Sequence, residues 1–124
     1  MSQLNKNELE VLRILWSEGE LKPAEIQDQF EWPIENPTLR SVLVGLVENG
    51  LISRQKRGKA FFYRAKARRK SHFSQSMRRM AKVFTGGSTA ELIMQLLKQE
   101  SLSPEEIEEL KRVANEKASE LDDE

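Results

Sequence analysis

The sequence has 124 residues, enough for one small domain or a domain with a helical appendage, and too few for two full cores. It has no cysteine, which excludes disulfides, zinc–thiolate sites and cysteine nucleophiles, and no apolar run approaches the ~18 residues of a membrane span. No signal-peptide pattern opens the chain, so we expect a cytoplasmic protein without membrane insertion.

Positive charge is concentrated in one segment of a chain whose formal net charge is zero. Residues 51–82 hold 12 Lys and Arg and no Asp or Glu, whereas residues 1–50 and 83–124 are acidic. Such a block attracts phosphate groups or an acidic membrane surface. The alternative is a solvated basic helix that acidic neighbours balance in the fold.

Three helices are predicted in the first fifty residues. "NELEVLRILWSEG" places apolar residues, among them Leu9 and Trp16, on one face and ends at a glycine. "KPAEIQDQF" is a short second helix with proline in its first turn. "NPTLRSVLVGLVENG" predicts a third helix, with Asn36 as N-cap and Pro37 at the first helical position. Its apolar spacing buries one face, made of Leu39, Val42, Leu43, Leu46 and Val47.

A hairpin and three more helices follow. "LISRQK" and "KAFFYR" are β-prone runs joined around Arg57-Gly58. From Lys66 the period is helical until Gly86-Gly87, and two amphipathic helices come after it, "STAELIMQLLKQ" and "SLSPEEIEELKRVANEKASEL". This order predicts a mainly α fold with a small β-hairpin wing. We expect a winged helix-turn-helix DNA-binding domain in residues 1–70 and a helical dimerisation region in residues 71–124.

The third helix and the wing supply the candidate DNA contacts. Arg40 can bond a guanine edge bidentately, and Val44 can contact a thymine methyl group. Basic residues of the wing would meet the phosphate backbone. The full candidate set is Asn36, Thr38, Arg40, Ser41, Val44, Arg54, Lys56, Arg57 and Lys59. The alternative is that any amphipathic surface helix displays such residues.

Two further features of this half bear on the interface. Gly45 costs ~1 kcal/mol in a helix interior relative to alanine, which indicates close approach by DNA or by a neighbouring helix. Phe61 and Tyr63 point to one side of the second strand and Phe62 to the other. We interpret these aromatic residues as packing supports for the wing rather than as platforms for base stacking.

The chain lacks a constellation for catalysis. The one histidine, His72, stands in a basic stretch without a carboxylate pair or a glycine-rich phosphate loop to work with. We therefore expect no enzyme activity, no catalytic or metal-binding residues and no cofactor.

The last two helices show a broad apolar stripe. Its members are Leu92, Ile93, Leu96, Leu97, Ile107, Leu110 and Ala114. We interpret the stripe as a homodimer surface, and the alternative is the core of an intramolecular helical hairpin.

With these segments in this order, the sequence resembles the penicillinase-repressor family of bacterial transcription regulators. The resemblance runs from about Leu4 to Ala118 and rests on "ELEVLRILW", "TLRSVLVGLVENGLI", "RGKAFFY", "FTGGSTAELIMQLL" and "LSPEEIEELKRV" in order. It implies a homodimeric repressor whose winged helices bind an operator dyad of double-stranded DNA. It also implies a membrane sensor protease as a further partner.

Two departures from the family pattern concern induction. Well-known members are cut at an Asn-Phe bond, where this chain has Gln95-Leu96, and the copper-responsive branch carries cysteines that this chain lacks. The apolar residues around Gln95 are expected to be buried, so cleavage there would need local opening. These departures favour control by a ligand or partner over cleavage. The alternative function is a winged-helix module for protein–protein contact or RNA binding.

Overall fold

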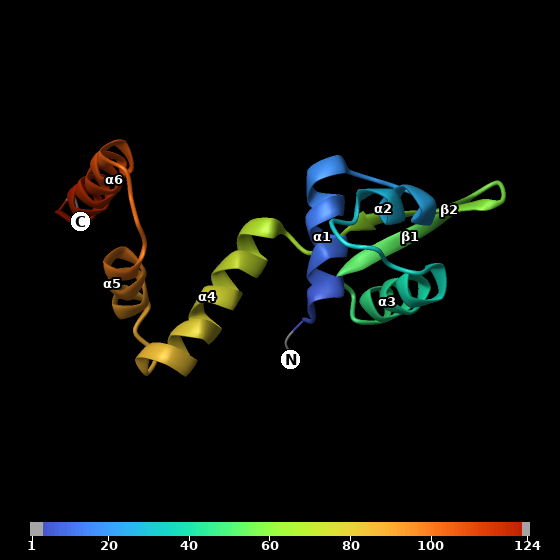
Figure 1. The fold of residues 1–124 in the computed structure, drawn as a ribbon, viewed down its shortest axis with the longest axis horizontal. Helices are drawn as coiled ribbons and strands as arrows, with labels where there is room; N and C mark the ends of the chain where they lie inside the picture. The colour runs from blue at the N-terminus through green and yellow to red at the C-terminus, as the bar shows by residue number, and fades with distance from the viewer. Residues whose placement is uncertain (1–3, 123–124) are drawn as a thin grey trace. The chain divides into compact units, whose positions relative to one another are not determined.

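The computed structural model describes residues 4–122, so the ends of both expected domains, residues 1–3 and 123–124, lie outside it. Six helices and one hairpin follow each other in the expected order, which confirms the mainly α fold with a β-hairpin wing (Figure 1). The elements are α1 (Lys6–Glu18), α2 (Pro23–Gln29), α3 (Asn36–Glu48), β1 (Ile52–Arg57), β2 (Ala60–Ala65), α4 (Arg69–Thr85), α5 (Thr89–Gln99) and α6 (Pro104–Asp122). They form two compact units, Met1–Ser76 and Met77–Glu124.

The first unit has a single apolar core. Helices α1, α2 and α3 each turn one apolar face inward, and the base of the hairpin closes the core. The fully or nearly fully buried side chains are Val11, Leu12, Ile14, Leu15, Ile26, Leu39, Leu43, Leu46, Ile52 and Tyr63. This core fixes α3 so that the opposite face of the helix is exposed.

The hairpin is anchored at its base and free at its tip. Strands β1 and β2 pair antiparallel from Ile52↔Ala65 to Arg57↔Ala60. Leu21 forms an isolated antiparallel β-bridge at the outer edge of β2, exchanging two backbone hydrogen bonds of 3.0 and 2.8 Å with Tyr63. A two-residue turn closes the tip, with Gly58 in its first position at φ +61°. Figure 1 shows the tip projecting beyond the three helices of this unit.

Side-chain hydrogen bonds fasten the helices and loops of the first unit. The buried Glu10 carboxylate accepts hydrogen bonds from the Arg13 side chain and, at 2.9 Å, from the backbone N–H of Glu31. The Trp16 indole N–H donates to the carbonyl oxygen of Ala67 at 2.9 Å, which ties the segment before α4 to α1. The contacts of Glu10 with Glu31 and of Trp16 with Ala67 join segments that are distant in sequence.

The second unit holds the end of α4 together with α5 and α6. Ser88 caps α5 by accepting a 3.0 Å bond from the backbone N–H of Glu91. Ser103 and Glu106 form a capping box at the start of α6, with bonds of 2.9 and 3.1 Å. Within residues 4–122, no helix is both long enough and apolar enough to cross a membrane.

Some local predictions were wrong. Glu35, rather than Asn36, is the N-cap of α3, so the helix begins one residue earlier than expected and Asn36 occupies its first turn. The helix expected from Lys66 begins at Arg69, because Lys66 and Ala67 donate backbone bonds to the carbonyl oxygen of Leu51. Leu9 is 41% exposed, since the buried face of α1 is centred on other residues.

Candidate nucleic-acid interface

The outer face of α3 is exposed and lacks internal partners. Thr38, Arg40, Ser41 and Val44 are all exposed, as is Asn36 in the first turn. In the part of the chain that the structure describes, the Arg40 guanidinium has no hydrogen-bond or ion-pair partner. Its five donors therefore remain available for an external acceptor.

Gly45 lies in the middle of α3 and has open space beside it. A Cβ atom at this position would meet no heavy atom of the described residues within 4 Å, its own chain neighbours and helix backbone apart. The alternative that a neighbouring helix of the same chain requires this glycine is therefore wrong. Close approach by DNA at this position stays a prediction.

One face of the wing presents two cations over an aromatic ring. In the register of the hairpin, Arg54 and Lys56 lie on the same face as Phe61 and Tyr63. The Arg54 guanidinium lies 4.7 Å from the Phe61 ring centroid and the Lys56 ammonium 5.8 Å from it. Phe61 packs partly on the core, so it supports both charges near the tip, as expected for a packing residue.

Arg57 lies on the opposite face of the wing and is already engaged. Its guanidinium forms an ion pair with Glu20 and stacks 4.5 Å from the Phe62 ring centroid. Lys22 approaches the same ring at 6.0 Å, a contact that the sequence pattern had not indicated. Lys59, in the turn, is exposed. Of the four wing candidates, Arg54 and Lys56 are presented freely near Phe61 and Lys59 lies at the tip. Arg57 is paired with Glu20.

The apolar side chains of α5 and α6 are mostly uncovered within the chain. Leu92 is 7% exposed, but Ile93 is 60% exposed, and Leu96 and Leu97 are close to half exposed. In α6, Ile107 is half-buried, while Leu110 and Ala114 are exposed. The expectation that the apolar residues around Gln95 are buried is therefore confirmed for Leu92 but wrong for Ile93, Leu96 and Leu97 in the single chain. The intramolecular hairpin alternative does not account for this stripe.

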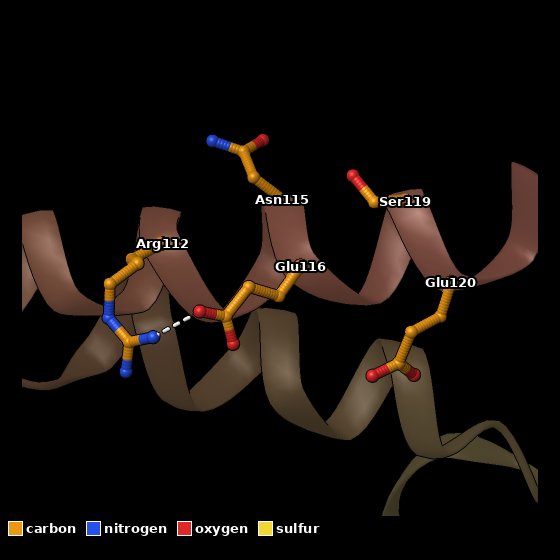
Figure 2. A pocket seen from close by; sticks show the side chains of 5 residues that line it. All are labelled: Arg112, Asn115, Glu116, Ser119 and Glu120. Atoms are coloured by element: carbon orange, nitrogen blue, oxygen red, sulfur yellow. Dashed lines mark hydrogen bonds and ion pairs between the residues drawn. The ribbon is translucent and has the colours of Figure 1, made fainter.

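A shallow hollow of about 490 Å³ runs along α6. The side chains that line it do not converge on a common point, as those of a binding or catalytic site would. Figure 2 shows that the side chains of Asn115 and Ser119 point away from those of Arg112, Glu116 and Glu120, although all five line the hollow. Arg112 is paired with both Glu109 and Glu116, and the pairing lowers the pKa of the Glu109 carboxyl. Among residues 4–122, no three His, Asp or Glu side chains gather as potential metal ligands.

A helix-turn-helix whose third helix has an exposed outer face, followed by a basic β-ribbon, is the arrangement of winged-helix transcription regulators that bind DNA. A family model described as penicillinase repressor matches residues 4–116, and the chain belongs to that family of transcriptional repressors.

Individual relatives agree with this assignment. The methicillin resistance regulatory protein MecI of Mammaliicoccus sciuri is 30% identical over 120 residues, which cover 93% of this chain and 95% of MecI. The penicillinase repressor of Bacillus licheniformis is 23% identical over 92% of this chain and 91% of that protein.

Solved structures are similar in fold. RosR of H. salinarum gives a TM-score of 0.54 at 16% identity and covers 94% of this chain and 96% of its own. BpsR of Bordetella bronchiseptica gives 0.51 at 18% identity, over 95% of this chain and 77% of its own. At such identities the similarity concerns the fold alone.

Proposed function

We propose that the protein represses transcription by binding an operator dyad as a homodimer, with residues 1–70 binding DNA and residues 71–124 forming the dimer. The unpartnered outer face of α3 carries this proposal, because a recognition helix needs side chains that are free to reach base edges in the major groove. Arg40 and Val44 are assigned to bases, and Asn36, Thr38 and Ser41 to bases or phosphates. Arg54, Lys56 and Lys59 are assigned to the phosphate backbone.

Dimerisation through α5 and α6 is supported by the uncovered apolar stripe on these helices. Exposed apolar side chains in contiguous positions are typical of a surface that another protein covers. The largest exposed members of α5, Ile93, Leu96 and Leu97, are candidates for the centre of that surface. A second copy is the favoured partner, because two linked winged helices can engage two half-sites at high effective concentration.

Mobility shift on duplex DNA tests this function. The probe is the region upstream of the protein's own gene, first intact and then with one half of the dyad scrambled. We expect one dimer to bind the intact dyad and binding to weaken strongly when a half-site is lost. Equal affinity for the two duplexes and for an unrelated duplex would refute operator recognition.

The alternative, a module for protein–protein contact or RNA, is distinguished by the same assay. Free cations occur on both α3 and the wing, at Arg40, Arg54 and Lys56, and this favours duplex DNA. Preference for single-stranded or hairpin RNA over the upstream duplex would favour the alternative.

We assign the protein a cytoplasmic location, no enzymatic activity and no cofactor, with a membrane sensor protease as the candidate partner in induction.

A further inference from the structure

A second basic surface lies on the face of the wing that the proposed DNA interface does not use. It surrounds a hollow of about 660 Å³ within the first unit, between the end of α1, the wing and the segment leading into α4. Five of the residues that line it are basic: Arg57, Arg64, Lys66, Arg68 and Arg69. The register places Arg57 and Arg64 on the face opposite Arg54 and Lys56.

The charges around this hollow are not balanced. Its one acidic lining residue, Glu20, is already paired with Arg57. Within residues 4–122 the other four cations have no acidic partner, and Arg64 reaches only the Ser53 hydroxyl at 3.4 Å. Like charges gathered around one hollow repel each other, and a bound anion would relieve that repulsion.

The inner side of the hollow offers an apolar surface. Leu15, Trp16 and Gly19 line it from α1. The Trp16 indole N–H is already bonded to the carbonyl oxygen of Ala67, so the indole contributes its ring rather than a donor. The hollow thus combines an aromatic surface with several guanidinium and ammonium donors. Such donors bind phosphate through charge-assisted hydrogen bonds.

We propose that this hollow is an anion site that takes a small phosphate-bearing molecule, independently of the duplex on the other face of the wing. The shared chemistry is the phosphate group, which DNA could also supply. Arg57 and Arg64 lie on the face of the wing opposite Arg54 and Lys56, and Arg57 is already paired with Glu20, which favours a soluble molecule over the duplex assigned to the Arg54 face.

Fluorescence of Trp16 measures binding at this site. The chain has two tryptophans, so Trp32→Phe leaves Trp16 as the only reporter. We expect inorganic pyrophosphate to change this fluorescence saturably at low ionic strength. Adding Arg64→Gln and Lys66→Gln should weaken the affinity for pyrophosphate by about tenfold, because two solvent-exposed charged contacts are lost. A matched control, Lys98→Gln with Lys117→Gln, removes the same charge elsewhere and should leave the response unchanged.

Two results would overturn the proposal. The first is a response that is not saturable, or one that both double variants weaken equally, since either shows general attraction rather than a site. The second comes from DNA titrations of full-length protein. If Arg64→Gln with Lys66→Gln also lowers the salt dependence of duplex binding by about two phosphate contacts, these cations belong to the DNA interface. Unchanged circular dichroism of the variants verifies that each is folded.

Discussion

Arg40 and Lys56 are both exposed cations, but their surroundings assign them different roles in DNA binding. Arg40 projects from the outer face of α3, where a planar guanidinium can form two bonds with guanine. Lys56 lies on the narrow wing beside Phe61, where a point charge meets phosphates of any sequence. The paired Arg57, close to Lys56 in sequence, provides an internal comparison.

Substitution of these three residues should separate base recognition from backbone binding. We expect Arg40→Ala to weaken operator binding by ~1–3 kcal/mol and to relax preference at one base pair. Lys56→Ala should weaken all duplexes alike and reduce the salt slope by about one contact. Arg57→Ala should change the slope less, because Glu20 already neutralises Arg57. The measurement is affinity for operator and scrambled duplex across a salt series, and a reversal of the Arg40 and Lys56 effects would contradict the assignment.

Substitution of Gly45 should change the stability of the fold and the affinity for DNA in opposite directions. Gly45→Ala should raise the free energy of unfolding by up to ~1 kcal/mol, since alanine favours a helix and its Cβ meets no described residue. The same methyl group should weaken operator binding if DNA approaches this turn of α3. Thermal melts and mobility shifts on one preparation test both effects. Ser17→Ala in α1 is the control, and tighter or unchanged operator binding by Gly45→Ala would remove Gly45 from the interface.

At the scale of elements, Glu10 joins α1 to the turn between α2 and α3. Hydrogen bonds from the Arg13 side chain are the main cause of the lowered pKa of this carboxyl, the backbone N–H of Glu31 lowers it further, and burial opposes both. Its pKa therefore lies below the ordinary value of 4.5 in the folded protein. The ionised carboxylate stabilises the fold, and this contribution is present above the unfolded pKa.

Glu10→Gln should consequently destabilise the protein by ~1–3 kcal/mol at neutral pH. As pH falls from the unfolded pKa through the lower folded pKa, the wild type loses this advantage and its stability approaches that of the variant. Urea unfolding of both proteins from pH 7 to pH 3 gives the comparison. Asp28→Asn, an exposed change in α2, controls for general charge effects. A stability difference that persists below the folded pKa would contradict the linkage.

The order of elements follows from the sequence because it depends on local periodicity. The apolar spacing of α3 and the alternation in β2 each report one buried face. The partners of Glu10 and Arg57 were not predictable, since Glu31 and Glu20 lie 21 and 37 residues away. The exposure of Ile93 and Leu96 also escaped prediction, because periodicity reports an apolar face without revealing whether the same chain covers it.

For the whole molecule, the dimer should depend on the second unit. Truncation after Gly87 removes α5 and α6, and with them the exposed apolar stripe. Because the core of the first unit is self-contained, we expect a folded monomer that binds the dyad much more weakly. Light scattering reports the mass, and mobility shift reports the affinity. An unchanged oligomeric state after truncation would place the dimer surface elsewhere.

The isolated β-bridge at Leu21 makes the base and the tip of the wing differ in the protection of their backbone amides. At the base, Tyr63 of the hairpin also exchanges backbone hydrogen bonds with Leu21, whereas the residues flanking Gly58 belong to the hairpin alone. Amide hydrogens near Tyr63 should therefore exchange with solvent only through larger openings of the unit, and those near the tip through local fraying. Duplex binding should slow exchange selectively at the tip, which makes deuterium uptake by that peptide a direct record of wing engagement.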